Sequence, residues 1–484
     1  MKLFLLLGFL LITPVVFAQD LEGKLNVAID QLELDSQFRH SIISLYIVDG
    51  SSGKVMFDHN SRIGLAPASC QKVITSISAF ELLGKDYSYT TTLAYSGTIR
   101  DDRLNGDLYI NGTGDPTLGS WRFSSTKENI VLNKFIEACK HIAPKGLSDH
   151  SKIKTNQFFW GPQTIPDGWI WQDIGNYYGA GASSLNWREN QFDLILKSGN
   201  SIGDPVSITQ TNPAKVYGIK LLNRLKAGPA GSGDNAYIYL PPGSCQGYLL
   251  GSIPIAQNHF VISGAYPEPA YLLRQSLFQN LSVSKAKNTP LHPINKLEDE
   301  NSYDSIDPNQ NFENVKLPGR LKTFYTHSSP PFDSINFWFL KKSINLYGEA
   351  IVKTIAFKLT SVGTTDSGVS CIRRFWSDRG IDGGSLKIID GSGLSPGNRV
   401  TTKALVTVLL YGQNKTWFPS FYYDLPEING IKMKDGYING VRSYAGYTKS
   451  KNGRQYTFAF VINNFDGNPG SVREKMWKVL DIIK

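Results

Sequence analysis

Three short elements of the sequence contain the residue types that serine acyl transfer requires. In the first, PASCQK, Ser69 and Lys72 stand three residues apart at the start of a segment with helical periodicity. Residues i and i+3 share one face of a helix, so the Lys72 amine can reach the Ser69 hydroxyl and accept its proton where burial lowers the amine pKa. Alone the motif is weak, because the same spacing often arises by chance as a capping serine and a surface lysine.

Two further elements follow in chain order. The Ser343–Asn345 tripeptide lies at the junction of two helical stretches, where a hydroxyl and an amide can line a cleft. Lys434, Asp435 and Gly436 lie on a predicted strand, where the glycine leaves room for a substrate backbone at the strand edge. Together the three elements predict an acyl-transfer site with a nucleophile, a proton shuttle and a substrate clamp.

These elements, with several longer segments, resemble the class C low-molecular-mass penicillin-binding proteins, the D-alanyl-D-alanine carboxypeptidase/endopeptidases. The longer segments include NGTGDPTL, GNYYGAGASSLNW, HSSPP and DGSGLSPGNRVT, and the resemblance covers nearly the whole chain. The long gap between Ser69 and Ser343 is also similar to this family, whose members carry two extra domains there. The resemblance implies an α+β multidomain fold, in which a penicillin-binding, β-lactamase-like transpeptidase domain carries two inserted β-rich domains.

The resemblance also implies a role for each residue of the site. By this resemblance Ser69 is the acylated nucleophile, Lys72 its general base and Ser343 a proton relay. Asn345 is a hydrogen-bond partner of the substrate amide, Lys434 a source of positive potential, and Gly436 a residue of the substrate clamp. The backbone N–H groups of Ser69 and Tyr437 form the oxyanion hole. The implied reaction cleaves the peptide bond before a terminal D-alanine, or a D,D cross-link, in peptidoglycan. Penicillins are expected to acylate Ser69, and no metal or organic cofactor is required.

Asp435 departs from the family pattern. The family usually has Thr or Ser between the Lys and Gly of the third element, where the hydroxyl binds the substrate carboxylate. An anionic side chain a few ångströms from a carboxylate costs about 1–4 kcal/mol, depending on the local dielectric. We expect Asp435 to turn away, to pair with a nearby cation or to favour internal cross-links. The preference between carboxypeptidase and endopeptidase activity stays open.

A second departure concerns the stem-peptide side chain. Asp173 and Tyr178 stand at positions that resemble the family's diaminopimelate pocket, where an acid meets the ammonium of the peptide; an ordinary aromatic-rich loop is the alternative. In DGSGLSPGNRV the family often has Arg after the second Ser, whereas this chain has Pro396. Either Arg399 takes that role or the pocket recognises the side chain differently.

Two other functions compete with a D,D-peptidase. One is a catalytically weakened peptidoglycan-binding homologue, impaired by Asp435 in carboxylate recognition. Retention of the acylation residues argues against it, because a binding module does not need them. The other is a β-lactamase, which the long insertion between the motifs disfavours.

The elements that position these residues follow from periodicity. Helical spacing is found in residues 21–34, 65–84, 335–343, 347–359 and 471–484, and strand patterns in 41–50, 54–60, 431–438, 441–448 and 454–465. Because both ends have the pattern of one α+β domain, we predict a catalytic domain of residues 19–89 and 325–484, an inserted domain of 90–186 and 265–324, and a further one of 187–264. Residues 90–185 are expected to form short strands and turns, and the acidic stretch 296–315 a linker.

The composition limits the remaining possibilities. Lys and Arg outnumber Asp and Glu by 50 to 41 in 484 residues, but the basic residues are scattered, which argues against nucleic-acid binding. Residues 1–18 have the pattern of a signal peptide cut before Gln19, which predicts export to the periplasm or cell envelope without a remaining membrane span. A retained membrane anchor is the alternative, which the short apolar run and Pro14 disfavour. The four Cys form no CxxC pair, so four buried free thiols are expected, with a Cys139–Cys245 disulfide as the alternative. The sequence leaves the oligomeric state open.

Overall fold

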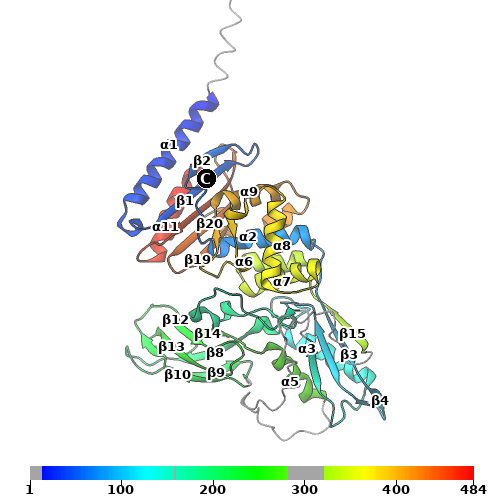
Figure 1. Ribbon diagram of the computed structural model, residues 1–484. Helices are drawn as coiled ribbons and strands as arrows, with labels where there is room; N and C mark the ends of the chain where they lie inside the picture. The colour runs from blue at the N-terminus through cyan, green and yellow to red at the C-terminus, as the bar shows by residue number, and fades with distance from the viewer. Residues whose placement is uncertain (1–12, 157–159, 215, 217, 282–320) are drawn as a thin grey trace, which may run out of the picture. The chain divides into compact units, whose positions relative to one another are not determined.

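The computed structural model describes residues 13–156, 160–214, 216, 218–281 and 321–484 (Figure 1). The chain divides into two compact units, Met1–Tyr87 with Phe332–Lys484, and Ser88–Pro331. We call them unit 1 and unit 2. The expected acidic linker at residues 296–315 lies outside the described residues.

Unit 1 is built on a six-stranded antiparallel sheet in the order β18-β19-β20-β21-β1-β2. Its strands are β1 (Ile42–Asp49), β2 (Val55–His59), β18 (Glu427–Ile428), β19 (Ile431–Ile438), β20 (Val441–Lys449) and β21 (Gln455–Asn463). Strand β1 pairs with β21 along its whole length, with Ile42 opposite Asn463. The two ends of the chain therefore share one sheet, as their sequence patterns predict.

Helices cover both faces of this sheet (Figure 1). Helices α1 (Thr13–Leu34) and α11 (Pro469–Leu480) pack on one face, where Phe458, Phe460 and Ile462 of β21 join their core. Helix α9 (Thr402–Gln413) lies on the other face and packs against α2 (Lys72–Leu82). Since side chains alternate along a strand, β21 is buried on both sides.

The remaining elements of unit 1 complete the layer around α2. They are α6 (Phe332–Lys341), α7 (Asn345–Thr360), α8 (Thr365–Ser377), α10 (Phe418–Asp424) and the short pair β16 (Leu386–Lys387) and β17 (Arg399–Val400). Helix α2 contacts α6, α7, α8 and α9. Residues Lys72 to Phe80 of α2 are consequently all buried, so the first turn of this helix is shielded from water.

Unit 2 contains several small sheets and two longer helices. One sheet has the order β15-β3-β6-β7, formed by Lys322–Ser328, Thr90–Tyr95, Leu108–Gly112 and Ile153–Asn156. A second has the order β14-β8-β9, formed by Phe260–Ala265, Gln191–Lys197 and Ser207–Asn212. A third contains β10 (Lys220–Asn223), β13 (Gln246–Pro254), β11 (Lys226–Gly228) and β12 (Asn235–Tyr239), and β4 (Thr98–Arg100) pairs with β5 (Arg103–Asn105). The proposed division of this region at residues 187–264 remains a prediction.

Unit 2 has two longer helices, and the first of them corrects the expectation of strands and turns in residues 90–185. Helix α3 (Glu128–Ile142) buries a narrow stripe of Val131, Phe135 and Cys139, spaced four residues apart. Helix α5 (Pro269–Leu281) begins at a proline, a residue that is tolerated in the first turn of a helix. The two helices pack against each other.

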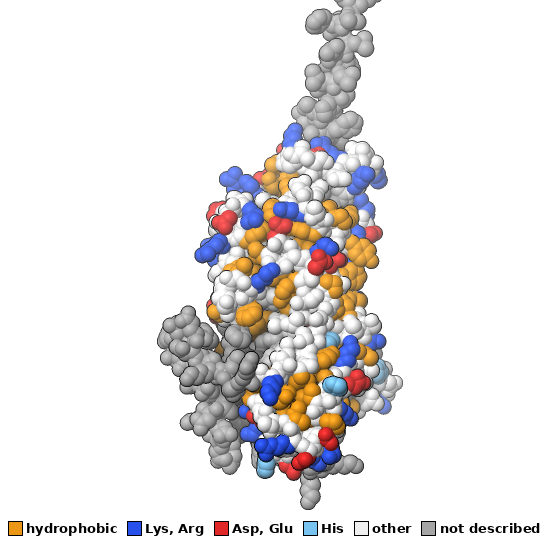
Figure 2. All heavy atoms as spheres, turned by 90° about the vertical axis from the view of Figure 1, so that its right-hand side faces the viewer, with side chains coloured by type: hydrophobic (Ala, Val, Ile, Leu, Met, Phe, Trp, Pro, Cys, Tyr) orange, Lys and Arg blue, Asp and Glu red, His pale blue; other side chains and the backbone are white. Residues whose placement is uncertain are grey.

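The cysteines and the surface agree only in part with the expectations. All four cysteines are free; Cys70 and Cys139 are buried, whereas Cys245 and Cys371 are half-buried, so the expectation of four buried thiols is wrong for these two. On the face shown in Figure 2, Lys and Arg are interspersed with Asp and Glu. No helix in the described part of the chain is long and apolar enough to cross a membrane.

Candidate active site

The candidate nucleophile Ser69 lies in a tight turn before α2. The turn is the 3-10 helix η2 (Ala68–Gln71), in which Ser69 is half-buried and its neighbours Ala68 and Cys70 are buried. Ala68 has a φ of 45°, a left-handed conformation that is uncommon for a residue with a side chain. Such strain persists only where the surroundings impose it, and it is frequent at functional sites.

Lys72 begins α2 and places its amine against three oxygen atoms. Its Nζ lies 2.9 Å from Ser69 Oγ, 2.7 Å from Asn345 Oδ1 and 2.7 Å from the carbonyl oxygen of Ser392. The last two oxygens can only accept hydrogen bonds, whereas a hydroxyl can also donate. A neutral amine, with two N–H groups and one lone pair, therefore satisfies all three contacts when Ser69 donates its proton toward Nζ.

The surroundings of Lys72 favour this neutral amine. Burial of the fully enclosed side chain, together with the positive charge of Lys434, lowers the pKa of Lys72 to about 7, although negative charges on Asp390, Glu349 and Asp435 oppose the change. A base with a pKa near neutrality is suited to proton transfer at physiological pH. The predicted serine–lysine pair is thus assembled with both the geometry and the electrostatics of a nucleophile and its base.

Asn345 and Ser343 come from the connection between α6 and α7. Asn345 is buried at the first position of α7, and its amide oxygen accepts from Lys72. Ser343 is half-buried two residues earlier, in a left-handed turn with a φ of 55°. The structure therefore places the second predicted element beside the first.

Strand β19 approaches the nucleophile turn from the other side. A Cβ atom added to Gly436 would lie 2.8 Å from both the Ser69 nitrogen and the Pro67 oxygen, and 2.3 Å from Ser443 Oγ. The Cys70 thiol donates to the carbonyl oxygen of Lys434 at 3.1 Å. Gly436 thus has a structural reason that the sequence interpretation did not give: it lets β19 lie against η2.

The thiol next to the nucleophile is unsuited to nucleophilic chemistry. Cys70 is fully buried, and this burial raises its pKa to about 12. The thiol therefore stays protonated at physiological pH. Cys70 packs in the core, as its position one residue after Ser69 predicts.

Lys434 and Asp435 form an ion pair within the third element. Lys434 Nζ lies 2.9 Å from Asp435 Oδ1 and 2.6 Å from the Asp435 carbonyl oxygen. Burial alone would raise the pKa of the Asp435 carboxyl, but the charge and hydrogen bond of Lys434 lower it. Of the possibilities expected for Asp435, the structure shows pairing with a cation, which is Lys434.

Tyr437 follows at the exposed edge of the site. The residue is 47% exposed, and the Arg442 guanidinium lies 5.0 Å from the ring centroid. The two residues face each other across β19 and β20. Strand β18 pairs with β19 only at Ile431 and Lys432 within the described chain, so the later part of β19 has no β18 residue opposite it.

Four buried polar residues around the site were missed by sequence reasoning. They are Glu349 and Lys353 on α7 and Asp390 and Ser392 in the loop before β17. Asp390 accepts hydrogen bonds from the backbone nitrogens of Gly393 and Ser395 and from the Gln71 amide. One signal was available: Asn345, Glu349 and Lys353 recur every four residues in a largely buried helix and therefore share one face.

The candidate stem-peptide residues belong to unit 2. Asp173 lies in the short helix α4 (Trp171–Ile174), and Tyr178 in the following 3-10 turn. Burial raises the pKa of the Asp173 carboxyl to about 6, although a hydrogen bond from Tyr178 opposes the rise. The structure thus pairs the two residues, while their role in recognition remains a prediction.

Arg399 lies in unit 1 and turns toward its own loop. One of its guanidinium nitrogens donates to the carbonyl oxygens of Pro396 and Asn398, and the residue is exposed. The suggested substitution of Arg399 for the family's arginine remains a prediction.

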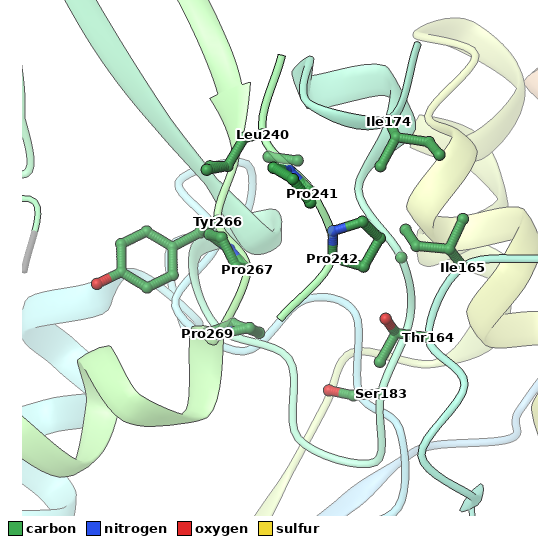
Figure 3. A pocket seen from close by; sticks show the side chains of 12 residues that line it. Thr164, Ile165, Ile174, Ser183, Leu240, Pro241, Pro242, Tyr266, Pro267 and Pro269 are labelled. Atoms are coloured by element: carbon green, nitrogen blue, oxygen red, sulfur yellow. The ribbon is translucent and has the colours of Figure 1, made fainter. Parts of the chain in front are cut away.

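A pocket in unit 2 differs in character from the site around Ser69 (Figure 3). Ile165, Ile174, Leu240, Pro241 and Pro242 are among the residues that line it. Its lining contains no Lys, His, Asp or Glu. It therefore lacks the nucleophile–base pair that Ser69 and Lys72 provide. Within the described residues no group of His, Cys, Asp and Glu side chains is arranged to hold a metal ion.

Comparisons with known proteins identify the family of the chain. The model of the D-Ala-D-Ala carboxypeptidase 3 (S13) family matches residues 25–289 and 305–481. A D-alanyl-D-alanine carboxypeptidase of an Actinomadura species is 24% identical, with 92% of this chain and 82% of that protein covered. The carboxypeptidase DacB of Haemophilus influenzae is 23% identical over 86% of this chain and 84% of its own.

A solved structure has the same fold. The crystal structure of penicillin-binding protein 4 (dacB) from Haemophilus influenzae superposes with a TM-score of 0.73, covering 96% of this chain and 99% of that one, at 18% identity. The agreement extends over both units. It supports the α+β multidomain, penicillin-binding fold that the sequence predicts.

Proposed function

The chain belongs to the D-Ala-D-Ala carboxypeptidase 3 (S13) family of serine D,D-peptidases, and from that premise we propose that it cleaves peptidoglycan stem peptides through an acyl-enzyme on Ser69. The main support for this proposal is the position of Lys72 Nζ, which lies 2.9 Å from Ser69 Oγ. It also lies 2.7 Å from Asn345 Oδ1 and from the Ser392 carbonyl oxygen, which only accept hydrogen bonds. This set of partners accommodates a neutral lysine that donates two N–H groups and receives the Ser69 proton, as a general base does.

The proposed reaction has two stages. In acylation, Lys72 takes the Ser69 proton while Oγ forms a bond to the carbonyl carbon of the penultimate D-alanine. The C–N bond then breaks, and the leaving amine receives a proton, for which Ser343 is the proposed relay. In deacylation, water attacks the ester, the Ser69 oxygen leaves with a proton, and the shortened peptide is released with a new carboxyl group.

The backbone of η2 and β19 supports the oxyanion assignment. The Ser69 nitrogen lies directly beside Gly436, the residue before Tyr437. Donors from both segments are therefore candidates for stabilising the oxyanion of the tetrahedral intermediate. The edge of β19 beyond Lys432 offers backbone groups with which an extended peptide can pair as an added strand.

The Lys434–Asp435 pair bears on which substrates are cleaved. Because Asp435 neutralises part of the Lys434 charge, the site offers less attraction to a free terminal carboxylate than a lysine followed by threonine. A weakened, peptidoglycan-binding homologue is the competing function that this observation favours. We propose an active peptidase, since Ser69, Lys72 and Asn345 are assembled in contact.

The cellular location is proposed from the N-terminal sequence. Helix α1 runs from Thr13 through the predicted cleavage point before Gln19, and its residues Leu25, Ile29 and Leu32 are buried in the core on the sheet. Cleavage there leaves the packed part of α1 in place. The packing of this helix is therefore compatible with a cut before Gln19, from which we propose export to the periplasm or cell envelope.

The test is to incubate the purified protein with benzylpenicillin and record intact mass. We expect a stable adduct of one penicillin on the wild-type protein and none on Ser69→Ala, since only the serine oxygen can form the ester. Absence of an adduct on well-folded wild-type protein would reject penicillin acylation and favour the binding function. Rapid hydrolysis of the penicillin without a persistent adduct would favour a β-lactamase.

A further inference from the structure

The carbonyl of Ser392 reaches Lys72 because its loop is held between two helices. From α2, Thr75 Oγ1 donates to the Gly391 oxygen at 2.7 Å, and the Gln71 amide donates to the Asp390 carboxylate at 2.9 Å. Gly391 passes close to α7, where an added Cβ would lie 2.4 Å from the Gly348 oxygen. The loop is therefore fixed at the peptide groups next to Ser392.

Glu349 holds the same loop from α7. Its two carboxyl oxygens each lie 3.1 Å from the Gly391 nitrogen, and its carboxyl also has a hydrogen bond from the Ser392 side chain. Glu349 is fully buried. A buried carboxyl is costly unless hydrogen bonds compensate for lost hydration, so these contacts are needed to keep it in place.

One helix thus contributes to both acceptors of the Lys72 amine. Asn345 begins α7 and accepts from Lys72 directly. Glu349 lies one turn further along the same face. It contacts Ser392, whose carbonyl oxygen is the second acceptor, and the preceding residue Gly391. A shift of the loop relative to α7 would move one acceptor while leaving the other.

We propose that Glu349 is a positioning residue for acylation, which holds the Ser392 carbonyl against Lys72 and thereby orients the amine toward Ser69. This inference rests on the proposed function, because it assigns a role in the deprotonation of Ser69. Glu349 contacts the loop through the Gly391 nitrogen, so its effect on Lys72 is exerted through the loop.

Several charges act on the same amine. Lys72 is faced by Lys434 and Asp435 from β19, by Asp390 from the loop and by Glu349 from α7, while Glu349 is faced by Asp390, Lys72 and Lys353. Burial, together with the negative charge of Asp390, raises the pKa of Glu349. A negative charge on Glu349 raises the pKa of Lys72, so removing it can only favour the neutral amine.

The experiment compares Glu349→Gln with Glu349→Met by the rate of benzylpenicillin acylation between pH 5 and 9, measured by intact mass. Gln keeps an oxygen that accepts from Gly391, whereas Met has a similar length and no such oxygen. We expect the Gln variant to acylate within about threefold of wild type, and the Met variant at least about tenfold more slowly, since small misplacements of reacting groups cost large factors in rate. The pH at which acylation reaches half its maximum should not rise in either variant.

The matched control is Asp424→Leu, which also removes a buried carboxylate of unit 1. Asp424 accepts a hydrogen bond from Asn336 at 2.6 Å and has no part in the proposed site. We expect this variant to lower the thermal midpoint while acylating at the wild-type rate at temperatures where it is folded. If Glu349 only stabilises the fold, Glu349→Met should behave like this control, with a lower thermal midpoint and an unchanged acylation rate.

The outcomes separate this inference from the proposed function. If well-folded wild-type protein gives neither an adduct nor penicillin hydrolysis, both are rejected. An adduct on wild type with equal rates for Gln and Met, whether both fast or both slow, rejects only the positioning role. If the Met variant does not fold, Glu349→Asp gives the test, since it withdraws the carboxylate from Gly391 by one carbon but keeps its charge. Acylation by the Asp variant slower than by the Gln variant supports the role, and equal or faster acylation rejects it.

Discussion

At the scale of single residues, the proposed reactivity of Ser69 depends on the protonation of Lys72. Burial and the nearby Lys434 charge lower the Lys72 pKa to about 7, so the amine loses its proton as the pH rises through neutrality. We therefore expect the acylation rate with benzylpenicillin to be low at pH 5 and to increase through about pH 7. Intact-mass measurements on samples quenched at fixed times give the acylation rate at each pH.

The control is Lys72→Arg, because a guanidinium keeps its proton at every pH in this range. General-base catalysis contributes a factor of about 100 to 10,000, and we expect acylation by this variant to fall by that order. A wild-type rate that does not change between pH 5 and 9 would contradict the role of Lys72 as the base.

Asp435 gives a second prediction at this scale. Replacing it with threonine removes the carboxylate that pairs with Lys434 at 2.9 Å and introduces a hydroxyl. We expect Asp435→Thr to raise kcat/KM for a peptide ending in D-Ala-D-Ala by about tenfold, which corresponds to about 1.4 kcal/mol less repulsion of the terminal carboxylate. Release of D-alanine is the measurement.

Asp435→Asn separates charge from hydroxyl in the same assay. It removes the negative charge without supplying a hydroxyl, so we expect an intermediate gain. If neither variant exceeds wild type, the Asp435 carboxylate does not restrict recognition of a substrate carboxylate.

At the scale of elements, the approach of β19 to η2 depends on Gly436. An added methyl group would meet Pro67 oxygen and Ser69 nitrogen at 2.8 Å, both of them backbone atoms. We expect Gly436→Ala to reduce stability by about 1–3 kcal/mol, as crowding does elsewhere, and to slow acylation because the strand is displaced from the nucleophile turn. Urea unfolding and the penicillin adduct measure the two effects.

Gly383 provides the comparison for this substitution. No atom lies within 4 Å of a Cβ added there, and the residue does not adopt a left-handed conformation. Gly383→Ala should leave stability and acylation close to wild type. Similar losses in both variants would mean that the effect is not specific to the contact between β19 and η2.

Element patterns in the sequence predicted much of unit 1 and less of unit 2. The predicted strands at 431–438, 441–448 and 454–465 correspond to Ile431–Ile438, Val441–Lys449 and Gln455–Asn463. The last of them is rich in aromatic and β-branched residues, so local preference and tertiary position agree there. Helix α3 was missed, since only three narrowly spaced residues of it are buried.

The site was predictable where a motif lies within one element and not where it depends on tertiary contacts. Ser69 and Lys72 are one turn apart, so their contact follows from local geometry. The contact between Lys72 and the Ser392 carbonyl joins segments far apart in the chain and uses a backbone atom that every residue has. No residue type marks such a partner, and the roles of Glu349 and Asp390 depend on the same loop.

At the scale of the whole molecule, unit 1 closes on itself where unit 2 is inserted. The Phe332 nitrogen donates to the Tyr87 oxygen at 2.7 Å, and the Asp333 nitrogen to the Lys85 oxygen at 3.0 Å. The two ends of unit 1 are therefore already adjacent. We expect a chain in which a short glycine–serine linker replaces residues 88–331 to fold cooperatively and to form the penicillin adduct.

Thermal unfolding of the shortened protein tests its folding, and intact mass tests its acylation. Ser69→Ala in the same shortened chain is the control for the site of attachment. A shortened protein that is soluble but lacks a cooperative transition would show that unit 1 needs unit 2 in order to fold.

The pairing of β1 with β21 has a consequence for the order of events during biosynthesis. Ile42 has its partner, Asn463, almost at the other end of the chain. The edge of β1 that pairs with β21 therefore has no partner until nearly the whole protein has been synthesised. Residues 88–331 emerge earlier and can fold while this happens, which shortens the effective loop that the sheet must close. The serine–lysine turn is thus synthesised early, but it gains β19 and the Lys434 charge only at the last stage, which delays reactivity until translation is almost complete.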